Sequence, residues 1–405
     1  MDTTDKLELL AGHMSLEPAE EYRLAPQGAG VGLASCSFSP AQPACGSSGE
    51  TSLKSKQEAL GIHHAVMPGG KRIALLKTLL TSACERDCYY CPFRAGRDFR
   101  RATFKPEEMA RTFLDMHQAK LAEGLFLSSG IAGGGVTTQD RLIATAEVLR
   151  HRFGFRGYLH LKLMPGAERA QVERAMQLAD RVSLNLEAPN SERLAHLAPH
   201  KTFLEELVRP LQWVEEIRRT QPARLGWNGR WPSTTTQFVV GAVGESDLEL
   251  LTVTARLNKT VRLARAYFSG FKPVEDTPLE NRLPENPWRE HRLYQASFLL
   301  RDYGFDLRDL PFMSGGNLPL DADPKLAWAQ AHLRESPLEV NRADRQALLR
   351  VPGFGVKGVE AILAARRKGK LRDLSDLQAL GVISSRAAPF VLLDGKRPTW
   401  QMRLW

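Results

Sequence analysis

Between residues 72 and 268, apolar stretches of strand type alternate with longer amphipathic stretches of helix type. The strand candidates are residues 73–80, 125–129, 158–163, 182–187, 235–240 and 261–268. The helix candidates, whose apolar residues recur three and four positions apart, are residues 106–122, 138–153, 167–179, 203–219 and 246–257. Strands and helices in strict alternation predict β/α units joined by right-handed crossovers. The predicted fold class is therefore α/β with a parallel sheet.

Two of these strands place polar residues at alternating positions. His160 and Lys162 share one face, and Ser183, Asn185 and Glu187 share another. A fully packed barrel would carry branched aliphatic residues inside. The polar faces therefore indicate the lining of a reaction chamber, although polar positions that face outward at strand ends would give the same pattern.

The first 60 residues are predicted to form an N-terminal extension that is mostly loop. A short helix is expected at residues 6–13, and residues 26–55 are rich in Gly, Ser, Pro and Ala. Cys36 and Cys45 lie in this stretch. They are either ligands of a second cluster or redox thiols, or else ordinary small buried residues.

A second, small all-α domain is predicted at residues 337–405, after a main domain at residues 61–320. It reads as a helix at 341–350, a turn containing Gly353 and Gly355, and a helix at 359–367. The two glycines allow a tight turn, so that amides at the start of the second helix can face a phosphate. The predicted counter-charges are Lys357, Arg366, Arg367 and Lys368. A degraded second copy at residues 375–393 is expected to pack against the first.

The distribution of charge supports this interpretation of the tail. The 405-residue chain has a formal net charge of +9, and residues 337–405 hold 13 Lys and Arg against 6 Asp and Glu, a surplus of +7. Such a surplus is typical of contact with a nucleic-acid backbone, which positions a protein without reading sequence. The alternative is a basic domain that packs or docks on protein. The polar start and the absence of a long apolar run predict a cytoplasmic protein without a membrane span.

Three of the five cysteines fall within eight residues, in Cys84-Glu-Arg-Asp-Cys88-Tyr-Tyr-Cys91. Thiolates spaced in this way hold iron–sulfur clusters, and three ligands instead of four leave one iron open. A zinc site pairs two C-x2-C knuckles, and the sequence has no second one. A disulfide framework is typical of short secreted chains with an even number of cysteines.

This motif resembles the C-x3-C-x-aromatic-C signature of the radical S-adenosylmethionine (SAM) enzymes. The resemblance implies a 4Fe–4S cluster on Cys84, Cys88 and Cys91, with SAM on the open iron and a 5'-deoxyadenosyl radical as the reactive species. It also implies a partial (β/α)6 TIM-like barrel with the cysteine loop at its C-terminal mouth. An electron donor such as a flavodoxin or ferredoxin is expected as a partner.

The same resemblance assigns further SAM contacts. Tyr90 is expected near the adenine, and Asn185 and Glu187 are expected to contact SAM from the fourth strand. Most members carry Gly-Gly-Glu after the second strand, whereas this chain has Ser128-Ser129-Gly130, whose carbonyls are expected to meet the SAM amino group. Gly241 either allows close approach of the adenosyl group or simply makes a strand-to-helix turn.

Longer phrases resemble one group within this superfamily, the DNA modification and repair radical SAM proteins. The likeness covers about residues 55–390, and the tail resembles their helix-hairpin-helix module. The phrases are residues 75–81, 185–190, 197–201, 265–279 and 288–295. A radical formed inside a barrel requires a flipped or single-stranded nucleotide. RNA (tRNA) modification, and a non-catalytic iron–sulfur DNA-binding sensor, remain as alternatives.

Overall fold

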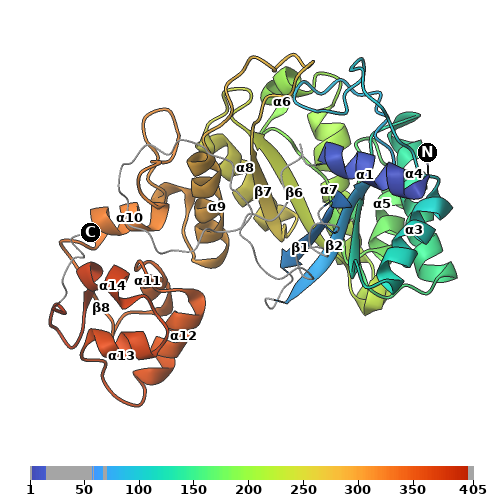
Figure 1. Ribbon diagram of the computed structural model, residues 1–405. Helices are drawn as coiled ribbons and strands as arrows, with labels where there is room; N and C mark the ends of the chain where they lie inside the picture. The colour runs from blue at the N-terminus through green and yellow to red at the C-terminus, as the bar shows by residue number, and fades with distance from the viewer. Residues whose placement is uncertain (1, 15–56, 58, 67–70, 400–405) are drawn as a thin grey trace, which may run out of the picture. The chain divides into compact units, whose positions relative to one another are not determined.

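The computed structural model describes residues 2–14, 57, 59–66 and 71–399 (Figure 1). Cys36, Cys45 and most of the predicted N-terminal extension lie outside the described residues. The chain divides into two compact units. One unit comprises residues 1–237, 261–267 and 273–282, and the other comprises residues 238–260, 268–272 and 283–405.

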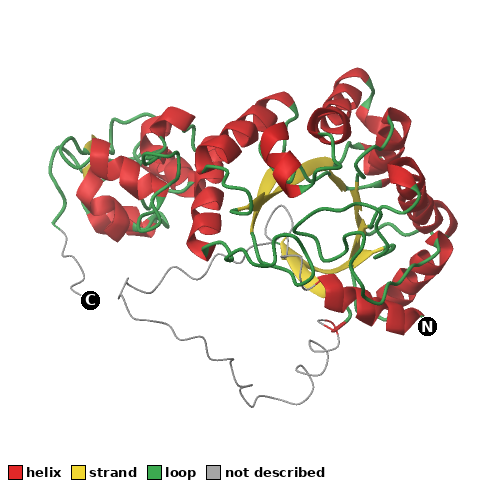
Figure 2. Cartoon of the chain, turned by 90° about the horizontal axis from the view of Figure 1, so that it is seen from above, coloured by secondary structure: helices red, strands yellow, loops and turns green. Residues whose placement is uncertain are grey.

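A seven-stranded sheet of order β1-β2-β3-β4-β5-β6-β7 forms the centre of the fold. Its strands are β1 (Ile62–Val66), β2 (Arg72–Leu79), β3 (Gly124–Ser128), β4 (Tyr158–Lys162), β5 (Arg181–Ser183), β6 (Ser233–Val240) and β7 (Arg265–Gly270). Strands β2 to β6 pair in parallel, with Leu76 opposite Leu125 in one register. Figure 2 shows the strands curling into an open arc with helices outside it. The predicted α/β class and partial barrel are confirmed.

Strand β1 was not predicted, and it pairs antiparallel with β2 at the edge of the sheet. Its sequence does not alternate, because Ile62 and Ala65 are buried while His63 and His64 between them are exposed. A strand whose apolar and polar residues do not alternate cannot be recognised from the sequence pattern.

The five predicted helices are present with shifted ends. They are α3 (Pro106–Gln118), α4 (Gly134–Glu147), α5 (Arg169–Leu178), α7 (Arg209–Thr220) and α8 (Asp247–Thr260). Helix α3 begins at the predicted residue, α4 begins four residues earlier, α5 and α8 begin one or two residues later, and a π-helical segment at Phe203–Val208 precedes α7. Further helices are α1 (Thr3–Met14), α6 (Ser191–Leu197), α9 (Pro287–Asp302) and α10 (Pro324–His332). No helix in the described part of the chain is long and apolar enough to cross a membrane.

Helix α3 illustrates why these segments are helical. Pro106 occupies its first turn, and the Glu108 carboxylate accepts a hydrogen bond from the Lys105 amide at 3.1 Å, which caps the start. Its buried stripe, including Met109 and Phe113, faces the core. The helix ends before Lys120, whose φ of 58° is left-handed.

The tail contains α11 (Arg345–Leu349), α12 (Val356–Ala365), α13 (Leu374–Ala379) and α14 (Ser384–Ala387), around buried residues such as Phe354 and Ile362. A parallel pair of two-residue strands, β8 (Leu338–Glu339) and β9 (Val391–Leu392), joins its ends. The prediction of an all-α tail is therefore wrong in this detail. The isolated pair is too short to leave a sequence pattern.

One buried guanidinium fixes the amino ends of β4 and β5. Arg150 donates to the carbonyls of Leu178, Phe155 and Gly157 at 2.8–2.9 Å, and to the carboxylate of Asp180 at 3.0 Å. Its side chain has no exposed surface, and burial lowers its pKa to about 10 despite the Asp180 charge. Two chain segments, residues 155–157 and 178–180, therefore depend on a single side chain.

We expect Arg150→Met to lower the free energy of unfolding by about 3–5 kcal/mol, because it leaves Asp180 buried beside unpaired carbonyls. Chemical denaturation measures this loss. The matched control is Arg152→Met, which removes a half-exposed ion pair to Glu107 and should cost less than about 1 kcal/mol. Equal losses in the two variants would contradict a structural role for the buried arginine.

Candidate functional site

The three motif cysteines lie on a loop, residues 82–101, that follows β2 at the carboxyl edge of the sheet; we call it the cysteine loop. Its two ends are joined, because the Ser82 amide donates to the Ala102 carbonyl and the Ala102 amide donates to Ser82 Oγ, both at 3.0 Å. The hydroxyls of Thr81 and Thr103 bond to each other at 2.6 Å just beneath. The loop is therefore closed by protein contacts alone.

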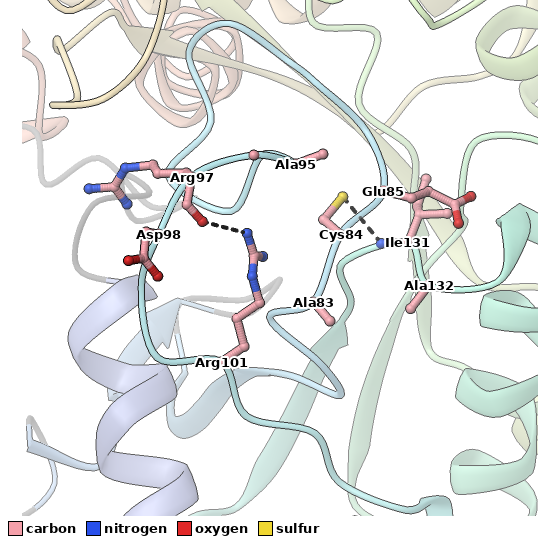
Figure 3. Close-up of a pocket in the computed structure, with 10 residues that line it drawn as sticks. Ala83, Cys84, Glu85, Ala95, Arg97, Asp98, Arg101, Ile131 and Ala132 are labelled. Carbon is pink, nitrogen blue, oxygen red and sulfur yellow. Dashed lines mark hydrogen bonds between the residues drawn. The ribbon is translucent and has the colours of Figure 1, made fainter.

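Arg101 holds the inside of the cysteine loop. Its guanidinium donates to the carbonyls of Ser82 (2.7 Å), Phe93 (3.0 Å), Arg94 (2.9 Å) and Arg97 (3.2 Å). Figure 3 shows this side chain reaching the Arg97 carbonyl across the pocket. The sequence analysis did not identify Arg101, since an arginine that bonds only backbone carbonyls belongs to no motif.

None of the three motif cysteines forms a disulfide bond within the described part of the chain. Cys88 is buried, while Cys84 and Cys91 are half-buried. The sulfur of Cys84 accepts a hydrogen bond from the Ile131 amide at 3.4 Å (Figure 3). The sulfur of Cys91 accepts one from the Phe93 amide, also at 3.4 Å. Burial raises the pKa of Cys88, although the neighbouring Lys201 opposes that effect. The described residues contain no group of three His, Cys, Asp or Glu side chains close enough for one metal ion. This spacing suits a cluster, in which each cysteine binds a different iron.

The segment after β3 runs directly against the cysteine loop. The Gly130 amide donates to the Thr81 carbonyl at 2.7 Å, and a Cβ on Gly130 would lie 2.3 Å from the Ala83 carbonyl oxygen. The structure thus places Ser128, Ser129 and Gly130 beside the cysteine loop, and it explains why position 130 is glycine. Their contact with a SAM amino group stays a prediction.

Glu85, inside the motif, binds the start of α4. Its carboxylate accepts hydrogen bonds from the amides of Gly133 and Gly134, both at 3.1 Å, and its own amide donates to Ile131 at 2.8 Å. A cavity of about 530 Å³ opens between these segments. It is lined by Ala83, Cys84, Glu85, Ala95, Gly96, Arg97, Asp98, Arg101, Ile131 and Ala132. This volume is in the range of small-molecule sites.

A buried ion pair lies beside the cysteine loop. Glu187 follows β5 with a φ of 65°, and its Oε1 lies 3.3 Å from Lys201 Nζ. The two side chains are only 6% and 9% exposed. Glu187 Oε2 is also buried, and among the described residues it has no hydrogen-bond partner. Glu187 therefore has one oxygen available for a ligand.

The segment that carries Lys201 is fixed to the cysteine loop. The Tyr89 amide donates to the Leu197 carbonyl at 2.8 Å, Arg86 donates to the His200 carbonyl, and His200 lies 2.8 Å from the Asp87 carboxylate. The sequence analysis did not identify Lys201 as a site residue. Its position between α6 and α7 carries no motif, and only the fold brings it to the cysteines.

Charges in this region depend on one another. Burial alone would lower the pKa of Lys201, but the neighbouring Cys88, Glu187 and Cys91 raise it, so the ammonium stays charged. Burial raises the pKa of Tyr90 well above its ordinary value, and the charge of Glu187 adds to the effect. The structure thus brings Tyr90 and Glu187 together, as the proposed SAM site requires.

Strand β5 ends at Ser183, so Asn185 and Glu187 lie beyond it and not on a strand face as the sequence predicted. Their segment still follows β6, because the amides of Leu184 and Glu187 donate to the carbonyls of Thr235 and Gln237 at 3.2 and 3.0 Å. Asn185 Oδ1 accepts a hydrogen bond from Lys162. A contact between Asn185 and SAM stays a prediction.

The alternating polar residues of β4 and β5 are buried. His160 Nε2 lies 2.8 Å from Ser183 Oγ, and the imidazole stacks on Phe126 at 4.1 Å between ring centroids. Burial and the nearby cations Arg181, Lys162 and Lys77 lower the pKa of His160 well below its ordinary value, so the ring is neutral. Since His160 and Ser183 are each only 2% exposed, they are not polar residues at exposed strand ends.

Gly241 makes the turn between β6 and α8. Its φ is +88°, and its amide donates to Glu245 Oε1. A Cβ at this position would lie 2.0 Å from Glu285 Oε2, so a protein side chain already fills the adjacent space. The turn therefore accounts for this glycine without a cofactor, and the SAM contact remains only a prediction.

The two hairpin glycines of the tail have different roles. Gly353 has a φ of +85°, and a Cβ there would lie 2.3 Å from the Ile383 carbonyl oxygen. The Ile383 amide donates back to Gly353 at 3.2 Å, so the second copy packs on the first as predicted. Gly355 has only Tyr303 Oη at 3.9 Å from such a Cβ, and it precedes α12, which has no side-chain cap. The space next to Gly355 is therefore open, and a ligand can approach the backbone there.

The predicted basic run does not surround the hairpin. Lys357 is exposed in the first turn of α12, whereas Arg367 and Lys368 are exposed beyond its last turn, ~15 Å further along the axis. Arg366 donates to the carbonyls of Val340 and Ala343 at 3.2 and 2.5 Å, which ties it to its own domain. A single phosphate at the hairpin can contact Lys357 and not the distal residues.

No protein-family model matches the chain. No curated protein matches it either. Fold and site together define an α/β protein with an open parallel half-barrel and a three-cysteine loop at its carboxyl edge.

Among solved structures, the chain is similar to methylornithine synthase (17% identity, TM-score 0.44), with 56% of this chain and 61% of that one covered. It is also similar to the FeFe-hydrogenase maturase HydG from Carboxydothermus hydrogenoformans (15%, TM-score 0.44), with 56% and 51% covered. A third match is a radical SAM methyltransferase from Sphaerobacter thermophilus (16%, TM-score 0.41), with 58% and 69% covered. With TM-scores below 0.5, these matches do not by themselves define the activity of this chain.

We expect Lys201→Met to make the reduction potential of the reconstituted cluster more negative, by roughly 60 mV or about tenfold in a one-electron equilibrium. Removal of a cation beside thiolates destabilises the more negative, reduced state. Redox titration followed by electron paramagnetic resonance measures the shift. Lys77→Met is the control, since Lys77 is also buried but lies by Phe126. An unchanged potential in Lys201→Met would show that the ammonium acts only in packing.

Proposed function

We propose that the chain is a radical SAM enzyme that binds a 4Fe–4S cluster through Cys84, Cys88 and Cys91 and acts on nucleic acid, with DNA as the preferred polymer. One observation carries the proposal. Three cysteines that form no disulfide with a described residue lie on a loop that protein contacts hold closed, beside a buried carboxylate oxygen without a hydrogen-bond partner among the described residues.

The residues present fit SAM as well as the cluster. A buried carboxylate oxygen without a hydrogen bond is costly, and a ligand ammonium or hydroxyl at Glu187 Oε2 removes that cost. The carbonyls of Ser128, Ser129 and Gly130 offer further acceptors, and Tyr90 offers an aromatic ring. When bound, the cluster and SAM supply an electron and a 5'-deoxyadenosyl radical that removes a hydrogen atom from the substrate.

The chain's own residues prepare the site. Arg101 and the joined ends of the loop fix the cysteines, and Lys201 keeps a positive charge among the thiols and Glu187. The neutral His160 and the hydroxyl of Ser183 add a buried polar face. These groups orient and balance charge, and no step requires them to exchange a proton.

The nucleic-acid substrate is supported by the tail. The α12 amides after Gly355 lie at an uncapped helix start, which attracts anions, and Lys357 is exposed beside them. The tail also holds a surplus of +7. Contacts of this kind bind the backbone, so the reacting nucleotide has to be flipped or single-stranded.

Two other functions use the same residues. RNA modification would require the same backbone contacts, and a comparison of DNA and RNA binding separates it from the first proposal. A non-catalytic iron–sulfur sensor would bind DNA without consuming SAM. The two assays described next distinguish these functions.

We expect anaerobically reconstituted protein to bind about four irons per chain and, once reduced, to convert SAM to 5'-deoxyadenosine. Single replacements Cys84→Ala, Cys88→Ala and Cys91→Ala should each abolish the conversion, because each removes one iron ligand. Iron analysis and chromatography of the nucleoside measure both properties. Turnover that survives all three replacements would refute the radical SAM assignment, while a stable cluster without turnover in the wild type would favour the sensor.

We expect the tail to bind DNA with little sequence preference, and Lys357→Glu to lower the slope of log affinity against log salt by ~0.9 or more, as expected for each lost phosphate contact. Gly355→Val should weaken binding because its side chain covers the helix start, whereas Gly353→Val is unsuitable because it would strike the Ile383 carbonyl.

Fluorescence anisotropy at several salt concentrations measures these effects. The control for Lys357→Glu is Lys259→Glu, which makes the same change of charge at an exposed position in the last turn of α8. Equal effects of Lys259→Glu and Lys357→Glu would show that the hairpin does not hold the polymer.

A further inference from the structure

Helix α9 carries an exposed indole in its first turn. Trp288 is 56% exposed, which is unusual for so large an apolar side chain. Within the same compact unit, Leu248, Leu283, Met313 and Leu320 are also exposed. Neither the cysteine loop nor the hairpin uses Trp288, so its exposure requires a separate explanation.

The indole is held in place although it is exposed. Pro287 starts the helix, and the Trp288 amide donates to Asn286 Oδ1 at 2.9 Å. The Arg292 guanidinium lies 5.1 Å from the indole centroid, and the His291 ring meets it edge-on at 5.6 Å. A fixed aromatic surface loses little entropy when a flat ligand stacks on it.

Arg292 is itself fixed. It donates to the Leu320 carbonyl at 2.8 and 3.2 Å and to Gln295 Oε1 at 2.8 Å, and it is 7% exposed. Nucleic-acid bases stack on aromatic side chains, and cation–π contacts of arginine accompany such stacking in proteins that bind single strands. The arrangement therefore suits a nucleobase better than an aliphatic side chain.

A series of charged contacts runs from Trp288 to the hairpin. Arg292 interacts with the charge of Asp323, and Asp323 accepts a hydrogen bond from Arg386. The Cβ of Arg386 lies 3.2 Å from the position of a Cβ on Gly353. The indole and the proposed phosphate contact thus belong to one unit and are joined by three side chains.

The same end of α9 lies against the carboxyl end of β7. Glu290 Oε2 accepts a hydrogen bond from the Gly270 amide at 2.9 Å, and the Glu285 amide donates to the Phe271 carbonyl at 2.8 Å. Parallel barrels carry their chemistry at the carboxyl ends of their strands. Trp288 therefore belongs to a helix that contacts the carboxyl end of β7 within the same unit.

We propose that Trp288 is a stacking platform for an unpaired nucleobase of a nucleic-acid strand bound at the hairpin. This inference rests on the proposed function. The Arg292 guanidinium and the His291 ring contact the indole, whereas the centre of a protein-docking surface is depleted of charge. Stacking also tolerates any base, which agrees with backbone binding that reads no sequence.

The test compares three labelled oligonucleotides of one length: single-stranded DNA, the same strand with abasic positions, and its duplex. The variants are Trp288→Ala, Trp288→Phe and, as a matched control for exposed apolar surface, Leu283→Ala. Trp288→Ala should bind the single strand roughly fivefold to a hundredfold more weakly than wild type. Trp288→Phe should retain most of the affinity, and Leu283→Ala all of it.

Two further readouts separate stacking from packing. The cost of Trp288→Ala should vanish on the abasic strand, where no base remains to stack, and the salt slope should stay that of wild type because the phosphate contacts remain. Thermal denaturation of each variant confirms folding.

Three outcomes would overturn the inference. The first is that Trp288→Ala binds the single strand with wild-type affinity. The second is that Trp288→Ala loses as much affinity for the abasic strand as for the intact strand. The third is that Trp288→Ala keeps its DNA affinity but no longer self-associates in sedimentation, which would assign the indole to contact with a second copy of the chain. If the wild-type protein binds none of the oligonucleotides, the proposed nucleic-acid function fails, and the platform with it. Binding by wild type with no effect at Trp288 overturns only the platform.

Discussion

The site depends on one balance of charge. Three cysteine sulfurs and the Glu187 carboxylate gather at the carboxyl edge of the sheet, and negative charges that are buried close together repel one another. Lys201 is the cation that lies among them, with its ammonium 3.3 Å from Glu187. The segment that carries it is bonded to the cysteine loop at Tyr89, Arg86 and Asp87. The position of α6 and the chain that follows it is therefore as much a part of the site as the cysteine motif.

The sequence predicted the parts of the fold that repeat. Six strands and five helices have clear apolar periods, and the structure contains all of them, with boundaries shifted by a few residues. Strand β1 and the pair β8/β9 were not predicted, because five irregular residues and two-residue strands have no period to detect. Strand β5 ends four residues early, since the chain from Leu184 to Glu187 keeps hydrogen bonds to β6 through an irregular path that ends at a left-handed Glu187.

The site was predictable only where its residues form a motif. The cysteines and the hairpin glycines are close in sequence, so spacing identifies them. Arg101 bonds backbone carbonyls of the cysteine loop, and Lys201 pairs with Glu187 beside the cysteines. Neither contact follows a sequence motif, so only the folded chain shows it. Arg366 illustrates the opposite error, because a basic run suggested a phosphate contact where the structure shows bonds to Val340 and Ala343. Gly353 and Gly355 look equivalent in sequence, but only Gly353 is required by packing.

The closed cysteine loop has a consequence for how the protein is assembled. Arg101 bonds four carbonyls of the loop, and Ser82 and Ala102 join its ends, so none of these contacts involves a metal. The chain can reach this loop geometry before iron arrives, unlike small zinc domains that fold only around their ion. Insertion of the proposed cluster then requires little rearrangement of the cysteine loop. Damage by oxygen would likewise empty the loop without unfolding it, which leaves the same polypeptide ready to be refilled.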